Sequence, residues 1–364
     1  MIFSASLKLT MGGLLAACFL SAYSHAAVVL EYHHVSETTP KSTSISPAHF
    51  KAQLDYLANN GFSVVPLSEL VDALRAGKPL PDKTVAITFD DAYASVYNTA
   101  FPLLKARGWP FTFFVNTEVV GQSTLFVSWA QLRTMAKAGV TIANHSSSHA
   151  HLVRLDKNET RAQWRARMKA DITTAQQKIQ QELGTAPMFM AYPFGEYDVE
   201  LQALVRELGY LAFGQQSGPL YEKGDLQALP RFPFGGSFTD LDDFILKVNT
   251  KPLPIQNIAF YADKTTPLPN LIVAAGARPW LVLNVEGDKL LGNINCFATG
   301  QGAINTEVIE GKVWVQAKQP LTQGRTRYNC TAHSGEKNGK QVRFYWYTQQ
   351  WLATNAKGEW QYQD

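Results

Sequence analysis

The chain has 364 residues, of which 46% are hydrophobic and 17% are charged, and its formal net charge is +3. This length favours two domains, and the composition excludes an intrinsically disordered protein. The small net charge is spread without a block of Lys or Arg, so nothing supports a nucleic-acid partner.

The first 26 residues have the pattern of a secretory signal peptide. Lys8 is their only charge, an apolar stretch follows at 9–22, and residues 24–26 (Ser-His-Ala) provide a cleavage site. An alternative is a lipoprotein processing site at Cys18, where a lipid would anchor the protein to a membrane. The sequence therefore predicts an exported protein, periplasmic or secreted, or an envelope lipoprotein if Cys18 is lipidated.

Strand-like and helix-like segments alternate from about residue 28 to 247. The longest helical pattern runs from Trp164 to Leu183, with an apolar residue every three or four positions and Gly184 as its C-terminal cap. The alternation predicts an α/β fold, either a barrel or a wound sheet. The predicted strands lie at 28–30, 62–65, 85–89, 111–115, 140–143, 188–192 and 210–213.

Two groups of polar side chains follow strands of this pattern. Asp90 and Asp91 come directly after one strand, and His145 and His149 come after another. Two imidazoles and one carboxylate can hold a divalent cation and leave a coordination position open for water. The second carboxylate is then available as a base. Iron oxygenases use a similar set of three ligands but do not need the second carboxylate, so they are an alternative.

The character of the sequence changes after about residue 251. Four prolines between 252 and 269 mark a linker, and no helical pattern follows. The pair Cys296 and Cys330 is predicted to form a disulfide between strands of a small β-sandwich. The β-rich runs of this sandwich lie at 280–283, 294–297, 312–315 and 342–347.

The last of these runs is rich in aromatic residues. Alternation places Phe344 and Trp346 on one face and Tyr345 and Tyr347 on the other. One interpretation is that one face belongs to the sandwich core and the other covers the barrel. A second is that the rings form a platform for sugars, because flat rings stack on pyranose faces.

Three motifs together resemble the NodB-homology polysaccharide deacetylases (carbohydrate esterase family 4). Residues 88–91 read Thr-Phe-Asp-Asp, residues 145–149 read His-Ser-Ser-Ser-His, and residues 192–195 read Tyr-Pro-Phe-Gly. The resemblance implies a metal-dependent hydrolase with a deformed (β/α) barrel of NodB-homology type. The resemblance covers about residues 28–247. Together with the signal-like segment and the β-rich runs it divides the chain into a signal peptide (1–26), a catalytic domain (27–255) and a β-sandwich accessory domain (256–364).

The resemblance also implies a role for each motif residue. In the family the first Asp is the general base, and the second binds a divalent metal, usually Zn²⁺, together with the two histidines. A water on the metal then attacks the acetyl carbonyl. Carried over, the base is Asp90 and the metal ligands are Asp91, His145 and His149. The resemblance further implies that Phe194, with Tyr192 beside it, binds the substrate and the oxyanion.

The sequence departs from the family pattern in two places. The Arg that precedes the third motif in the family is Ala191 here, and Arg231 either replaces it beside the base or is an ordinary surface residue. The acidic His of the family is also absent from its usual late position. Residues 32–35 resemble the start of the poly-N-acetylglucosamine deacetylase subgroup, in which the acid comes first, so His33 is the expected acid and His34 the alternative.

These features predict an enzyme that removes N-acetyl groups from an N-acetylglucosamine polysaccharide, either poly-β-1,6-N-acetylglucosamine or a chitin-type chain. An acetylxylan-type O-acetyl esterase is one alternative. A catalytically degenerate glycan-binding protein is the other.

Overall fold

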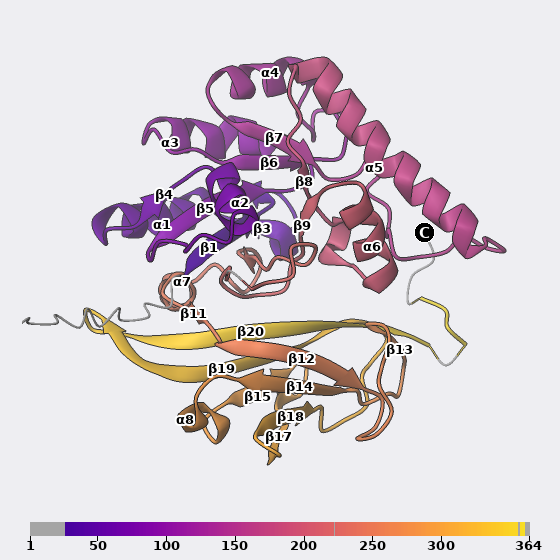
Figure 1. Cartoon of the computed structure of the whole chain (residues 1–364). Coiled ribbons are helices and arrows are strands. Elements are labelled where there is room, and N and C mark those ends of the chain that lie inside the picture. The colour runs from indigo at the N-terminus through magenta and orange to yellow at the C-terminus, as the bar shows by residue number, and fades with distance from the viewer. Residues whose placement is uncertain (1–25, 222, 356, 361–364) are drawn as a thin grey trace, which may run out of the picture.

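The computed structural model describes residues 26–221, 223–355 and 357–360. The predicted signal peptide, apart from Ala26, and Cys18 lie outside these residues. Parallel strands surrounded by helices form one part of the molecule, and mostly antiparallel strands form the other (Figure 1). The predicted fold class, an α/β barrel followed by a small all-β sandwich, is confirmed.

The barrel is built from a parallel sheet in the order β10-β1-β5-β6-β7-β8-β9, with β4 beside β5. The stretch 229–234, which contains β10, connects β9 at one edge of this sheet with β1 near the other edge. Leu229 N donates to the Ala212 carbonyl at 2.9 Å, and Phe234 N donates to the Glu31 carbonyl at 2.8 Å. The strands are β1 (Ala27–Tyr32), β4 (Ser63–Val64), β5 (Thr84–Phe89), β6 (Thr112–Val115), β7 (Thr141–Asn144), β8 (Phe189–Ala191), β9 (Leu211–Phe213) and β10 (Phe232–Pro233).

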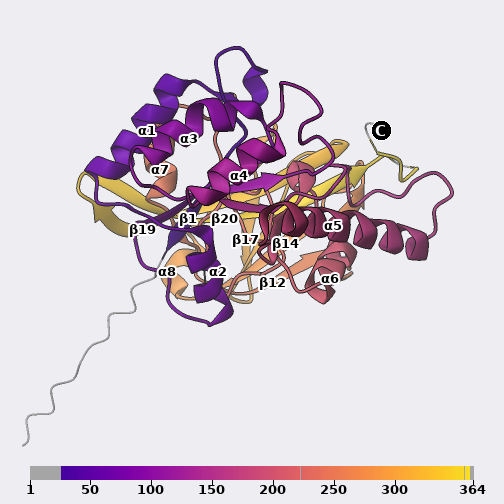
Figure 2. The same ribbon diagram turned by 90° about the horizontal axis from the view of Figure 1, so that it is seen from above.

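Helices cover the outside of the barrel (Figure 2). The helix α5 begins at a capping box formed by Thr160 and Gln163 and ends at Gly184, whose φ is 76°, as its sequence pattern predicts. Among the described residues, no helix is both long enough and apolar enough to cross a membrane. The helices are α1 (Pro47–Asn59), α2 (Leu67–Arg75), α3 (Phe101–Lys105), α4 (Trp129–Lys137), α5 (Arg161–Leu183), α6 (Val199–Glu207) and α7 (Leu241–Val248), with the short turns η1 (Lys41–Thr43), η2 (Val96–Ala100) and η3 (Pro193–Gly195) and the strand pair β2 (His34–Val35) and β3 (Ser44–Ile45).

The inside of the barrel is apolar at the end where the strands begin. Leu67 and Leu70 of α2 pack there with Ala27 and Phe189, the first residues of β1 and β8. The polar residues that follow the strands are therefore left at the opposite, carboxyl end, which is where (β/α) barrels carry their active sites.

The second part is a sandwich of two sheets. One has the order β11-β20-β19-β15-β16 with β13 beside β20, and the other the order β12-β14-β18-β17. The proline-marked segment contains β11 and β12 rather than a plain linker, and Pro252 is tolerated because β11 is an edge strand. The elements are β11 (Lys251–Pro252), β12 (Ile255–Tyr261), β13 (Ile272–Ala274), β14 (Trp280–Val285), α8 (Asp288–Leu291), β15 (Asn295–Ala298), β16 (Gly302–Ala303), β17 (Asn305–Ile309), β18 (Lys312–Gln316), β19 (Gly324–Asn338) and β20 (Gln341–Thr354).

The predicted disulfide is confirmed. Cys296 on β15 and Cys330 on β19 are direct partners across the two strands and form an S–S bond. The bond is buried in the core between the sheets.

Replacing Cys296 and Cys330 together by Ser is expected to lower the free energy of unfolding by about 3–4 kcal/mol, because the bond closes a loop of 34 residues in the unfolded chain. Urea denaturation of the full chain measures the change. Treatment of the native chain with a reductant should reproduce the midpoint of the double variant. An unchanged midpoint would show that the bond contributes nothing to stability.

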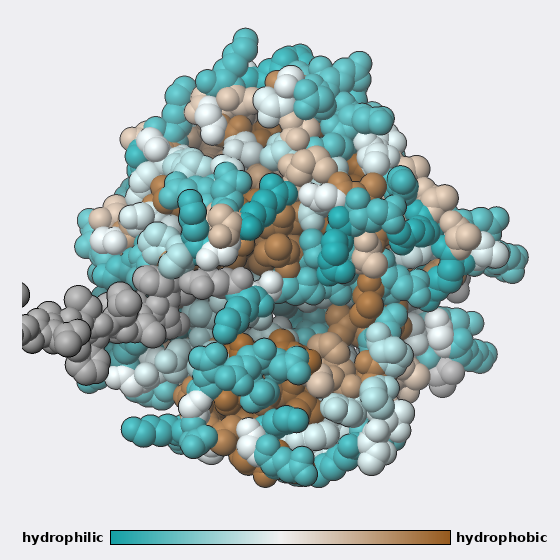
Figure 3. Space-filling view, in the orientation of Figure 1, coloured by the Kyte–Doolittle hydropathy of each residue, from teal (hydrophilic) through white to brown (hydrophobic). Residues whose placement is uncertain are grey.

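The hairpin of β19 and β20 lies against the barrel. The Trp346 ring meets the Phe232 ring of β10 edge-on, with 5.3 Å between centroids, and Tyr345 and Tyr347 pack against a buried cluster that draws residues from both parts of the molecule. The side of β20 that carries Trp346 therefore covers the barrel, as the first of the two interpretations predicts. The surface is hollowed near the middle of the boundary between the two parts (Figure 3).

Candidate active site

Loops at the carboxyl ends of β5, β7 and β8 meet in the structure, and their backbones are unusual. Asp91, Ser146, His149 and Phe194 have φ values of 73°, 62°, 59° and 55°. Side chains other than glycine rarely adopt this left-handed conformation, and it costs free energy unless the surroundings enforce it. Four such residues at one end of the barrel indicate loops held in a fixed arrangement for function.

The three predicted metal ligands lie together. Asp91 Oδ1 is 3.1 Å from His145 Nε2 and 3.0 Å from His149 Nε2. His145 Nδ1 lies 2.9 Å from the Ala191 carbonyl, so Nδ1 carries the hydrogen and the Nε2 lone pair faces Asp91. Two nitrogens and one oxygen with a hydrogen-bonded second ring nitrogen are a donor set that zinc prefers, and three ligands leave a position open.

The other carboxylate of the pair is held by Arg231. The Arg231 guanidinium donates two parallel hydrogen bonds to Asp90, at 2.8 and 2.7 Å, and both side chains are fully buried. Burial alone would raise the pKa of Asp90, but the attraction of Arg231 outweighs it and lowers this pKa below its ordinary value. The arginine that the third motif lacks is thus present at the same carboxylate, supplied by the segment before β10.

Glu31 is a further buried carboxylate that the sequence reasoning missed. Its Oε2 lies 3.7 Å from Arg231 Nε and its Oε1 lies 3.8 Å from His33 Nε2. Neither oxygen has a hydrogen-bond partner among the described residues, and burial raises the pKa of Glu31. An acidic residue within the otherwise apolar strand β1 is the signal that could have found it.

The two candidate acids are in different surroundings. His33 Nε2 lies 3.8 Å from Asp91 Oδ2, so it faces the three ligands. The His34 ring instead stacks on Tyr93, with 3.6 Å between centroids, and its Nδ1 is 3.2 Å from Ser95 Oγ. Burial, helped by the neighbouring His33, lowers the pKa of His34 to about 4. Because His33 faces the three ligands and His34 faces Tyr93 and Ser95, the geometry favours His33 as the acid.

The buried His34 is expected to make stability depend on pH. Between the unfolded pKa of about 6.5 and the folded pKa of about 4, the unfolded chain binds the extra proton. Stability is therefore fully present above pH 6.5 and falls by up to about 3 kcal/mol as the pH drops towards 4. Urea denaturation at pH 4.5 and 7.5 measures this slope. His34→Gln should flatten it, and His49→Gln, at an exposed site, should not; equal slopes would contradict the assignment.

The third motif is only partly in the site. The Phe194 ring lies 4.7 Å from the His149 ring and stacks on the His151 ring at 3.7 Å, measured between centroids. Tyr192 is fully buried in the core, and its hydroxyl donates to the Gln227 carbonyl at 2.9 Å. The Tyr192 side chain therefore packs and anchors the strand end, and Phe194 alone of this pair faces the ligands.

The sandwich also reaches this loop. Arg325 of β19 donates from Nη1 to the Phe194 carbonyl and to Gln215 Oε1, the latter at 2.8 Å. A Cβ at Gly195 would lie 2.6 Å from Gln215 and 2.7 Å from Arg325, so glycine is required there. No local sequence pattern connects Arg325 with a loop 131 residues earlier, and sequence reasoning missed it.

Comparison with known proteins agrees with the fold and the motifs. Residues 77–213 match the polysaccharide deacetylase family. This match contains all three motifs, so the resemblance that they carry is confirmed.

Two kinds of relative are similar to the chain. The poly-beta-1,6-N-acetyl-D-glucosamine N-deacetylase of Escherichia coli K12 is 26% identical over 240 residues, which cover 56% of this chain and 36% of that protein. The chain thus spans about a third of the length of this relative. The solved structure of IcaB from Ammonifex degensii is 27% identical, with a TM-score of 0.54 over 60% of this chain and 96% of that one. The deacetylase PplD of Streptococcus pyogenes shares the fold at 21% identity, with a TM-score of 0.55 over 61% and 98% of the two chains.

Proposed function

We propose that this protein is a metal-dependent deacetylase that removes N-acetyl groups from an N-acetylglucosamine polysaccharide. The observation that carries the proposal is the group of Asp91, His145 and His149 beside Asp90, which is itself held by Arg231. The activity named for the Escherichia coli relative favours poly-β-1,6-N-acetylglucosamine as substrate, with chitin-type chains as the second choice.

The proposal gives the two neighbouring carboxylates different tasks. Asp91 lies against two imidazoles and would bind the cation, whereas Asp90 is held by Arg231 and would act as the base. Arg231 keeps Asp90 ionised and fixes its orientation, so its oxygens can accept a proton from the attacking water.

A zinc ion held by Asp91, His145 and His149 would supply a Lewis acid for the acetyl carbonyl and lower the pKa of a water molecule. His33 would donate a proton to the amine nitrogen that leaves the acetyl group, because it lies next to Asp91 and has Glu31 behind it. The Phe194 N–H is the proposed donor to the oxyanion, in a loop whose carbonyl is bound by Arg325.

We also propose that the protein works outside the cytoplasm. The disulfide supports this, because such bonds persist in oxidising compartments. The signal-like first 26 residues support it as well, and lipidation at Cys18 is the alternative route to the envelope.

Acetate release by the purified, zinc-loaded protein tests the proposal. The substrates are oligomers of β-1,6-linked N-acetylglucosamine, chitooligosaccharides and acetylated xylan. We expect the fastest release from the β-1,6 oligomers. Fastest release from acetylated xylan would replace the amidase assignment by an esterase. No release from any of the three, with zinc bound, would overturn the enzymatic proposal and favour a glycan-binding protein.

A further inference from the structure

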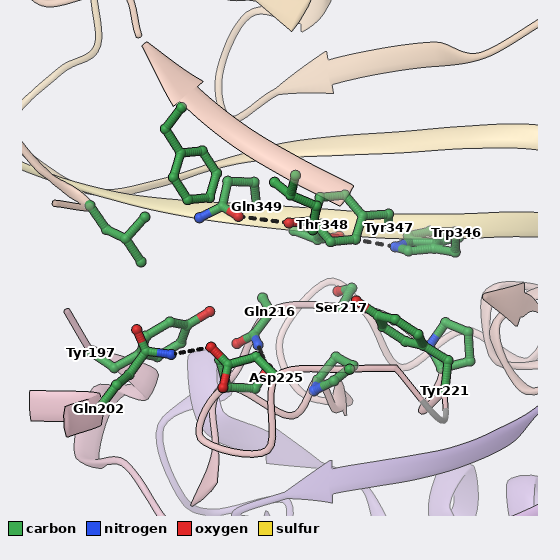
Figure 4. A pocket seen from close by; sticks show the side chains of 18 of the residues that line it. Tyr197, Gln202, Gln216, Ser217, Tyr221, Asp225, Trp346, Tyr347, Thr348 and Gln349 are labelled. Carbon is green, nitrogen blue, oxygen red and sulfur yellow. Dashed lines mark hydrogen bonds between the residues drawn. The ribbon is translucent and has the colours of Figure 1, made fainter. Parts of the chain in front are cut away.

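A cavity of about 360 Å³ lies between the barrel and the sandwich, and none of the proposed metal ligands lines it. Figure 4 shows side chains of β20 on one side of an open gap and side chains of the barrel loops on the other. Its size falls within the range of about 300–1,000 Å³ that is usual for ligand sites, and boundaries between domains are common places for such sites.

Aromatic rings from both parts of the molecule line this cavity. Trp346 and Tyr347 come from β20, and Tyr197 and Tyr221 come from the loops after β8 and β9 (Figure 4). Rings on two opposite walls can hold a flat ligand with apolar faces, because the ligand buries both faces at once.

The polar groups between the rings are largely fixed in place. Trp346 Nε1 donates to Thr348 Oγ1 at 3.1 Å, and Tyr347 OH donates to Gln349 Oε1 at 2.7 Å. On the opposite wall Gln202 Nε2 donates to Asp225 Oδ2 at 2.7 Å. These contacts leave hydroxyl and carboxylate oxygens in set positions, as a site for a ligand with several hydroxyl groups requires.

Gln216 is a buried polar residue in the wall of this cavity. Its Nε2 donates to the Ala228 carbonyl at 2.7 Å, but its Oε1 has no hydrogen-bond partner among the described residues, although the residue is only 3% exposed. A buried acceptor without a partner costs free energy, so this wall of the cavity is built at a cost to the fold. A side chain at Gly214 would displace this amide, since a Cβ there would lie 2.1 Å from Oε1.

The charges that line the cavity balance. Among its lining residues only Asp225 and Arg206 carry full charges, and they lie 4.0 Å apart. A cavity without net charge suits a neutral ligand better than a phosphate, a nucleotide or an acidic sugar. Apolar faces, several hydroxyls and no charge together describe a neutral pyranose.

We propose that this cavity binds one neutral, N-acetylated pyranose unit of a polysaccharide, at a site separate from the metal-ligand group. The lining of the cavity alone indicates a neutral pyranose. The further statement, that this pyranose is an N-acetylated unit of the substrate polymer, rests on the proposed function. The two sites are neighbours, because the Gln216 carbonyl accepts a hydrogen bond at 3.1 Å from the backbone N–H of Arg231, which holds Asp90. A chain that occupies both sites binds more tightly than one that reaches a single site.

Calorimetric titration with a β-1,6-linked pentamer of N-acetylglucosamine tests this site. The parent is the full chain carrying Asp90→Asn, so that the ligand is not turned over. Adding Tyr221→Ala removes a ring, and adding Ser217→Phe fills the cavity at a side chain that makes no hydrogen bond to another described residue. Each addition should weaken pentamer binding about tenfold or more. The matched control is Tyr261→Ala, whose ring stacks on Trp314 in the other sheet, and it should bind like the parent.

The outcomes separate this proposal from the proposed function. Parent-like pentamer binding by both Tyr221→Ala and Ser217→Phe, in chains with native circular dichroism, would overturn the cavity site. If the native chain still released acetate, the deacetylase proposal would stand without that site. If both variants weaken pentamer binding but the native chain releases no acetate from any substrate, the cavity is supported as a sugar site. The deacetylase proposal is then overturned.

Discussion

Replacing Asp90 by Asn is expected to lower kcat for acetate release by about a thousandfold, because the amide cannot accept the proton of the attacking water. Asn has nearly the same shape and can still accept one of the two hydrogen bonds from Arg231. The loss should therefore fall on kcat, and KM for the oligomer should change little. Steady-state assays of the zinc-loaded variant measure both constants.

The matched control is Asp55→Asn, which removes an exposed carboxylate that pairs with Lys51 and Arg107 on the outside of the barrel. It should keep the native kcat. Zinc content equal to that of the native chain would show that the loss in Asp90→Asn does not come from a lost metal. A kcat within twofold of the native value would remove Asp90 from the role of base.

Replacing Arg231 by Met is expected to lower the free energy of unfolding by about 3–5 kcal/mol, because it leaves a buried carboxylate without its cation. Asp90 loses both of its charge-assisted hydrogen bonds, and Glu31 loses the cation at 3.7 Å. Activity should fall as well, since the base is no longer held. Urea denaturation at pH 7 measures the stability change.

The double variant Arg231→Met with Asp90→Asn should recover part of this loss, because the unpaired charge at position 90 is gone. Arg133→Met is the control. It breaks an exposed ion pair with Glu182 and should cost less than about 1 kcal/mol. An Arg231→Met chain within 1 kcal/mol of the native one, or a double variant that is less stable than the single one, would contradict this account.

The elements that the sequence predicted well are those with a strong local pattern. The helix α5 has a regular apolar stripe and capping signals at both ends, so its extent is readable. Asp91, His145 and His149 were predicted to meet because parallel strands deliver the residues that follow them to the same end of a barrel. That rule needs only the strand order and not the details of packing.

Other elements were missed because their signal is weak. The strand β19 (Gly324–Asn338) buries Thr326, Tyr328, Cys330 and Ala332 in alternation, but these residues are small or partly polar and do not read as an apolar run. The strand β12 lies in the proline-marked segment, where prolines argue against a strand.

Some members of the candidate site could not be predicted because they depend on long-range packing. The sequence left Arg231 either beside the base or on the surface. Only the structure shows that its guanidinium binds Asp90. Arg325 reaches the Phe194 loop from the sandwich, a contact that depends on how the two parts of the molecule pack. Tyr192 carries the motif, but the direction of its side chain depends on the core around it.

Zinc reconstitution of the chelator-treated chain tests the central claim most directly. Metal is removed, its absence is verified by elemental analysis, and acetate release from β-1,6-linked N-acetylglucosamine oligomers is followed as zinc is added. The account predicts no release without metal and a rise that stops at one equivalent, with His149→Ala failing to recover at that ratio. Full release by the verified metal-free chain would contradict it.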